Sequence, residues 1–372
     1  MKKYLFGLLL LVGLVACDDS ETTPGGENLG KKVEMIVVNE GGMGKGLAAL
    51  SVVYEDGTSD SDIFKTVNKR PLGDVAQSIT FINGLYYVAL NNSKKVEVVE
   101  PETFESVATI SYEQEGKPRF ITPINDTEAL VSDLNKQLVR INTKTYKVIE
   151  YIPIDVAIEK MVTVNNKIFG VSGKTIQVFD TKAIKQESVR TVAKLEGSVY
   201  KTAKPIIDKN NKIWVLASGG TYFEPKILLH CINPATEEVE YTCNVPVIDK
   251  KSAEYVDGCI TGIESYPRMD TDRGHSKLYF NVRTLSGANS AYPVVYSFDI
   301  DKKELKPYRE LPGIGMIYGM GVSPDGDVYV CDCLDYTAQR GFLRQYKMDS
   351  EDVVSRRVGI YPRMVYFTEY DK

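Results

Sequence analysis

Acid–base chemistry by histidine in this sequence would have to use His230 and His275, because the 372 residues contain no other histidines. His230 lies beside Cys231 on a predicted strand, whereas His275 lies in a predicted loop, Arg268 to Ser276. Catalysis by a Cys–His or His–carboxylate pair needs the partners within hydrogen-bond reach of each other. We therefore predict no histidine-based active site.

Two segments imitate ligand-binding loops without completing them. Gly41 to Gly46 lacks the spacing and the Ser or Thr of a phosphate-binding P-loop. Asp270 to Gly274 begins like a calcium loop, but its glycine comes one place early and the closing Glu is missing. The two histidines and the cysteine spacing do not fit a zinc site. We predict no metal, no cofactor and no enzyme, while a carboxylate pair for glycoside hydrolysis stays open.

The cysteines allow one disulfide. Cys231 and Cys243 stand nearly equidistant from a predicted turn, Pro234 to Glu237, so they could face each other across a hairpin. Cys331 and Cys333 point the same way on one strand and are poorly placed to pair.

The N-terminus has the features of an export signal. Lys2 and Lys3 precede an apolar run, Leu5 to Val15, that is too short to span a bilayer. The run ends at Cys17 in the sequence Leu-Val-Ala-Cys, which resembles the lipobox of bacterial lipoproteins. We expect a signal peptide over residues 1–16, a lipidated Cys17 with a flexible tether over 17–32, and one folded domain over 33–372. A soluble secreted protein with a chance cysteine is the alternative.

The charge of the chain excludes one class of partner. Removal of residues 1–16 leaves 43 Lys and Arg against 50 Asp and Glu, a net charge of −7. No basic tail or Lys/Arg block offsets it, and nucleic-acid binding depends on neutralising phosphates. We predict that nucleic acid is not a partner.

A strand that closes in a polar turn recurs along the mature chain. It appears at Val96 to Thr103, Leu138 to Thr145, Ile176 to Lys182, Leu228 to Thr236, Val294 to Asp301 and Leu343 to Asp349. Each unit also contains an earlier hairpin and a following β-rich stretch. A period of about 40–50 residues with four strands is typical of β-propeller blades. The repeat predicts six complete blades between about residues 75 and 361.

The two ends of the chain predict a seventh blade. Val33 to Asn39, Leu47 to Tyr54 and Asp62 to Thr66 look like the second, third and fourth strands of a blade. Arg363 to Tyr370 looks like a first strand with nothing after it. Pairing the two ends removes free strand edges and closes the ring. The predicted fold is all-β, a seven-bladed β-propeller with four-stranded blades.

One face of this propeller is the candidate binding face. The connections on it are long and unequal, and long loops in compact domains are usually functional. Tyrosine offers a rigid apolar body with a hydrogen-bonding tip, which suits a large, partly polar ligand. The candidate ligand-binding residues are Asn39, Arg119, Tyr222, Phe223, Tyr255, Tyr292, Tyr318, Tyr336, Arg340, Tyr361 and Arg363. The single tryptophan, Trp214, is expected in the core.

The repeated unit, for example Val96 to Ser106 and Leu138 to Val148, resembles that of YncE-like seven-bladed propellers. The opening Val37 to Gly41, the lipobox and the acidic pair Asp18-Asp19 are similar to the lipoprotein branch of that family in Bacteroidetes. The resemblance implies an outer-membrane lipoprotein that faces the cell exterior. It also implies capture of cobalamin and its transfer to a TonB-dependent transporter.

The alternatives are a lipoprotein that binds surface glycans or a siderophore, and a propeller hydrolase or lactonase. Cobalamin is nearly neutral and rich in amides, so a broad rim of Tyr, Asn and Arg would suit it. A ferric catecholate siderophore is strongly anionic and would prefer a dense Arg/Lys cluster.

Overall fold

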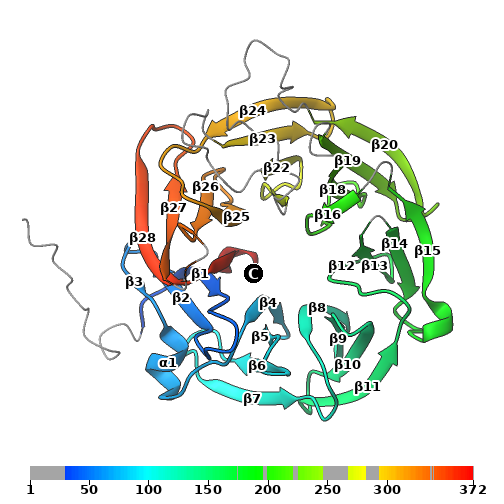
Figure 1. Cartoon of the computed structure of the whole chain (residues 1–372), viewed down its shortest axis with the longest axis horizontal. Coiled ribbons are helices and arrows are strands. Elements are labelled where there is room, and N and C mark those ends of the chain that lie inside the picture. The colour runs from blue at the N-terminus through cyan, green and yellow to red at the C-terminus, as the bar shows by residue number, and fades with distance from the viewer. Residues whose placement is uncertain are drawn as a thin grey trace, which may run out of the picture.

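Seven antiparallel sheets stand in a ring around a central channel (Figure 1). The computed structural model describes residues 30–173, 175–195, 199–220, 225–245, 267–281, 293–335, 337 and 339–371. Each sheet is one blade, with its strands arranged from the channel outward. The predicted seven-bladed β-propeller is confirmed.

The first three blades contain the N-terminal part of the chain. Blade 1 consists of β29 (Pro362–Phe367), β1 (Val33–Asn39), β2 (Ala49–Tyr54) and β3 (Ser59–Asp60). Blade 2 consists of β4 (Ala76–Ile82), β5 (Leu85–Leu90), β6 (Lys95–Val99) and β7 (Ser106–Ser111). Blade 3 consists of β8 (Pro118–Asn125), β9 (Glu128–Asp133), β10 (Gln137–Asn142) and β11 (Lys147–Pro153).

The other four blades follow in chain order. Blade 4 consists of β12 (Lys160–Val164), β13 (Lys167–Ser172), β14 (Thr175–Asp180) and β15 (Arg190–Lys194). In blade 5 the short strands β16 (Val199–Thr202) and β17 (Ile206–Ile207) share the inner position, followed by β18 (Ile213–Gly220), β19 (Pro225–Asn233) and β20 (Glu238–Asn244). Blade 6 consists of β21 (Arg268–Thr271), β22 (Lys277–Asn281), β23 (Val294–Asp299) and β24 (Glu304–Glu310). Blade 7 consists of β25 (Ile317–Val322), β26 (Val328–Asp332), β27 (Arg340–Tyr346) and β28 (Val353–Ile360).

The described helices are short: α1 (Ile63–Asn68), η1 (Gln186–Ser188) and η2 (Thr368–Asp371). Among the described residues, no helix has the length and apolar character needed to cross a membrane.

The ring closes as the sequence predicts. The C-terminal strand β29 pairs antiparallel with β1, so that Val37 lies opposite Val365 and Met35 opposite Phe367. The strand β29 thereby covers the inner edge of β1 and takes the inner position in the blade that joins the two ends of the chain.

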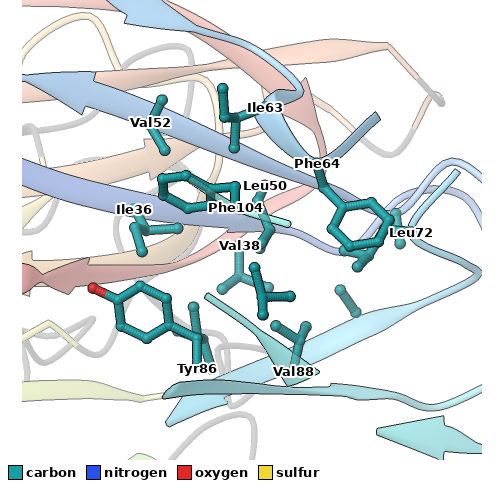
Figure 2. Packing of buried hydrophobic residues seen from close by; sticks show 14 of the residues in the cluster. Ile36, Val38, Leu50, Val52, Ile63, Phe64, Leu72, Tyr86, Val88 and Phe104 are labelled. Carbon is teal, nitrogen blue, oxygen red and sulfur yellow. The ribbon is translucent and has the colours of Figure 1, made fainter. Parts of the chain in front are cut away.

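The prediction for the outer strand of this blade was wrong. The segment expected as a strand, Asp62 to Thr66, instead caps and begins the helix α1, and the outer strand is the two-residue β3. Asp62 accepts a hydrogen bond from the backbone N–H of Lys65, the usual role of Asp before a helix. The helix buries Ile63 and Phe64 among residues of blades 1 and 2 (Figure 2). A strand would have alternated faces and exposed one of these two neighbours.

The hydrophobic core consists of layers between neighbouring blades. Figure 2 shows the layer between blades 1 and 2, where Val38 and Leu50 meet Val88. A comparable buried cluster lies at each of the other six blade interfaces. Trp214 is fully buried in one of them, as predicted, and its indole N–H donates to Asp208 over 2.8 Å.

The disulfide that the sequence allows between Cys231 and Cys243 is not formed. The hairpin of β19 and β20 contains a bulge between Cys231 and Ile232, and its register places Cys231 opposite Tyr241 and Cys243 opposite Leu229. The two cysteines are therefore offset along the hairpin, and both are free thiols.

The inner strands all enter the ring from the same face. Each four-stranded blade returns the chain to the side on which it started, so every inner strand begins at this face, called here the upper face. The segment Arg268 to Ser276, predicted as a loop, begins as one of these strands, β21, and only its second half forms the turn to β22. The first residues of the inner strands consequently meet around the upper end of the channel.

Candidate functional site

The upper end of the channel forms a cavity of about 470 Å³, which we call the upper cavity. This volume is in the range of pockets that hold small organic ligands. Most of its walls come from the first residues of the inner strands and from the connections that precede them, while Glu40 and Leu134 directly follow β1 and β9. All seven blades contribute a side chain: Arg363, Gln77, Arg119, Lys160, Lys204, Arg268 and Tyr318.

Five of these seven side chains are basic. Arg363, Arg119, Lys160, Lys204 and Arg268 come from blades 1, 3, 4, 5 and 6. Three carboxylates share the cavity with them, those of Glu40, Glu159 and Asp270. Five cations against three carboxylates leave an excess of two positive charges, in a chain whose total net charge is −5.

Two of the carboxylates, those of Glu40 and Glu159, contact cavity residues that come from different blades. Arg363 Nη1 donates to Glu40 Oε2 over 2.7 Å, and the Tyr318 hydroxyl donates to the same oxygen over 3.0 Å. Glu159 pairs with Arg119, and its Oε1 also lies 3.8 Å from Arg363 Nη2. These contacts join blades 1, 3, 4 and 7 across the channel.

Burial and mutual repulsion both disfavour the charged forms of two of these basic side chains. Burial, together with repulsion from Arg363, Arg268 and Arg119, lowers the pKa of Lys160 to about 7. Burial and the nearby Arg363 lower the pKa of Arg268 to about 10. Shifts of this kind mean that the surroundings of these side chains disfavour their positive charge, and an added anion would offset that cost.

The pKa values of two further groups in the cavity, Lys204 and Asp270, are also shifted. Burial lowers the pKa of Lys204 and raises the pKa of Asp270, and each charge partly stabilises the other. Lys204 lines the cavity and is an exposed residue. It is thus available to a ligand that enters from the upper face.

Gln77 is a buried cavity residue whose amide lacks hydrogen-bond partners within the described part of the chain. It lines the cavity and is 1 % exposed, and neither atom of its amide has a hydrogen-bond partner among the described residues. A buried amide without partners is costly and uncommon in native proteins. A bound ligand or a water molecule would satisfy it.

Of the residues predicted from the sequence, Arg119, Tyr318 and Arg363 line the upper cavity. Tyr361 lies next to them, with its ring 5.7 Å from that of Tyr318. Cys17, Tyr222, Phe223, Tyr255, Tyr292 and Tyr336 lie outside the described residues.

Two other predicted residues are placed elsewhere. Asn39 is fully buried, and its side-chain N–H groups bond to Val37 O, Ala49 O and Ser51 Oγ. Arg340 is exposed at the start of β27, and its Nε donates to Val358 O over 3.0 Å. Neither lines the upper cavity.

The sequence reasoning missed Glu40, Gln77, Glu159, Lys160, Lys204, Arg268 and Asp270. A signal for part of this set was present. The dipeptide Pro-Arg opens three inner strands, at Pro118-Arg119, Pro267-Arg268 and Pro362-Arg363. Proline is well suited to the first position of a strand because it has no N–H to donate to the sheet. An alignment of the blades on this dipeptide would have placed three arginines at one end of the channel.

The two histidines lie apart, as predicted. His230 is fully buried on β19, with its Nδ1 3.0 Å from Thr242 Oγ1. His275 lies in the turn between β21 and β22, with its Nδ1 3.1 Å from Ile207 O. Within the described ranges, no group of three or more His, Cys, Asp or Glu side chains is arranged to hold a metal ion.

A family model describes much of this chain. Residues 34–265, more than half of the sequence, match the family called domain of unknown function DUF5074. The chain belongs to this family. No curated protein matches the sequence.

Two solved structures share the fold. One is hydrazine synthase of Kuenenia stuttgartiensis, with a TM-score of 0.55 and 12 % identity over 77 % of this chain and 87 % of that one. The other is a chain of a mitotic checkpoint complex, with a TM-score of 0.53 and 9 % identity over 96 % of this chain and 91 % of that one. At such identities the likeness concerns the propeller fold alone.

Proposed function

We propose that this protein is a binding protein for an anionic small molecule, which it holds in the upper cavity without turnover. One observation carries the proposal: five basic side chains from five blades converge on one cavity in a chain of net negative charge. Bringing buried cations together without a ligand is unfavourable, so such a cluster is typical of a site that receives negative charge.

The positive charge of the cavity also favours anionic ligands over neutral ones. Arginine binds carboxylates, phosphates and catecholates through paired hydrogen bonds, and Arg119, Arg268 and Arg363 all line this cavity. A siderophore or another anionic chelate is therefore favoured over cobalamin, which is nearly neutral.

The proposed setting follows from the N-terminal sequence and the family resemblance. The signal-like segment, Cys17 and the polar tether support an exported lipoprotein at the outer membrane. In this setting the protein captures its ligand outside the cell and passes it to a TonB-dependent transporter.

Calorimetric titration of the purified protein tests the binding proposal. The probes are a ferric tris-catecholate, cyanocobalamin and a neutral oligosaccharide, each at low and high salt. We expect the anionic chelate to bind in the micromolar range and to weaken as salt rises, because opposite charges are screened. Tighter binding of cyanocobalamin or of the oligosaccharide would overturn the proposal.

A pair of matched variants locates the site. Arg268→Met removes a cation from the upper cavity, whereas Arg140→Met removes an arginine that pairs with Glu150 on the outer strands of blade 3. We expect Arg268→Met to weaken chelate binding about tenfold or more and Arg140→Met to leave it unchanged. Equal effects of the two substitutions would place the anion outside the upper cavity.

A further inference from the structure

Lys160 is one of the five basic residues that line the upper cavity, and it interacts with three of the others. It is the first residue of β12, and its ammonium donates to the carbonyl oxygen of Thr202 in blade 5 over 2.7 Å. Three guanidinium groups act on it, those of Arg363, Arg268 and Arg119. The neighbouring carboxylate of Glu159 pairs with Arg119 instead.

We propose that the upper cavity requires ligands with at least two negative charges and that Lys160 takes up a proton when they bind, so that affinity falls as the pH rises above neutrality. This inference rests on the proposed function and adds the ligand charge and the regulation of the site. A dianion matches the excess of two positive charges that the cavity holds when Lys160 is protonated.

The direction of the pH effect follows from linkage. With a pKa of about 7, Lys160 carries its proton in only about a tenth of the free protein at pH 8. A bound dianion offsets the repulsion from the arginines and raises the pKa of Lys160 in the complex. The complex then holds more protons than the free protein, so binding is strongest at low pH and weakens about tenfold for each pH unit above 7.

The other charged groups around Lys160 do not produce this effect near neutrality. From β8 it faces Arg119, and across the channel it faces Arg268 and Arg363, which keep their charges there. Val171, opposite Lys160 on β13, is apolar. Tyr318 is part of the opposite wall, and burial raises its pKa further above 10.

One group on the blade 5 side needs its own control. Lys204 also lines the cavity, and burial lowers its pKa as well. Any proton that it takes up will persist when Lys160 is replaced. A variant at Lys160 therefore separates the proton uptake of Lys160 from that of Lys204.

Succinate and monomethyl succinate are matched probes for the charge requirement, because they have similar size and differ by one charge. We expect succinate to bind the full-length protein at least about tenfold more tightly at pH 6.5. Equal affinities would overturn the requirement for two charges.

Calorimetry of succinate binding at pH 8, in two buffers with different ionisation enthalpies, counts the protons taken up. We expect the wild-type protein to take up close to one. Lys160→Arg keeps the charge at every pH, so it should bind at pH 6.5 within about threefold of wild type and lose the proton uptake that Lys160 contributes. Lys212→Arg, on the outer part of blade 5 where it pairs with Glu240, is the matched control and should behave as wild type.

The outcomes separate the two proposals. Succinate binding with an unchanged pH dependence and proton uptake in Lys160→Arg would overturn the role of Lys160 while leaving anion binding intact. Failure of every anionic probe at every pH would overturn the proposed function itself. If Lys160→Arg does not fold, Lys160→Met serves instead, and its succinate affinity at pH 6.5 should equal that of wild type at about pH 9.

Discussion

The propeller has a second cavity at its lower end, and it is nearly as large as the upper one. The lower cavity has a volume of about 440 Å³, compared with about 470 Å³. Five of its lining residues are acidic, Glu34, Glu55, Asp325, Asp327 and Glu369, and one is basic, Lys32. Two cavities of similar size in one ring thus have opposite charge.

The difference lies in how many blades supply the charges. The lower cavity is built by blades 1 and 7 and the segments next to them, where the two ends of the chain meet. Its acids mostly serve local structure: Asp327, for example, accepts hydrogen bonds from Gln345 and from the backbone N–H of Met348. Upper-cavity charges come from all around the ring and point at one space. Convergence of like charges from separate blades therefore distinguishes a candidate binding site from a charged surface.

The largest expected effect on stability comes from a substitution where the inner strands β25 and β29 approach each other closely beside the upper cavity. A Cβ atom on Gly319 of β25 would lie 2.1 Å from the carbonyl oxygen of Arg363 on β29. Gly319→Ala should therefore force the two inner strands apart, lower the stability by about 3 kcal/mol or more, and displace Arg363 from the cavity. Thermal unfolding and succinate titration measure the two effects.

A glycine of the lower face is the control for this substitution. At Gly274 an added Cβ would meet only ordinary contacts, 3.7 Å from Asp272 Oδ2 and 3.8 Å from Ser276 Oγ. Gly274→Ala should change the unfolding midpoint little. Similar losses in both variants would mean that the loss of stability does not come from the close approach of β25 and β29.

A smaller effect, on ligand affinity, is expected from removing one basic residue of the upper cavity, and the same change in the lower cavity is its control. Arg363→Gln removes the partner of Glu40 and one charge of the upper cavity, and we expect the affinity for succinate to fall about 10- to 100-fold. Lys32→Gln removes the basic residue of the lower cavity and should leave the affinity within about twofold. If both substitutions weaken binding equally, the anion responds to total charge and not to the upper cavity.

The smallest effect concerns the acids of the lower cavity. Burial, reinforced by Glu55, Asp327 and Asp325, raises the pKa of Glu34. The native state then binds a proton at Glu34 more readily than the unfolded state, so ionisation near pH 7 costs stability that is retained at acid pH. Glu34→Gln should raise the unfolding midpoint at pH 7 by about 1 °C.

The same measurement at low pH checks the sign. At pH 3.5 Glu34 is protonated in both states, so the substitution should have no effect there. The exposed Glu102, in the turn after β6, is the control, and Glu102→Gln should change neither midpoint. A lower midpoint of Glu34→Gln at pH 7 would mean that the Glu34 carboxylate is stabilised by its surroundings.

The sequence by itself determined the seven blades, their order and the closure of the ring by the C-terminal strand. These features depend on local patterns: strand alternation, turn residues and a repeat of similar length. Where a local pattern was ambiguous the prediction failed, as at Asp62 to Thr66, where the N-cap Asp62 and the adjacent apolar pair Ile63-Phe64 form a helix. The bulge that separates Cys231 from Cys243 was likewise invisible in their spacing.

Only the tertiary structure decided which charged residues share a site. Arg119, Lys160, Arg268 and Arg363 are separated by up to 244 positions in the sequence, and each looks like an ordinary residue at the start of a strand. They meet because seven inner strands begin at the same face around one axis. The arrangement of blades around that axis is a property of the closed ring, and so is the repulsion that gives Lys160 its low pKa.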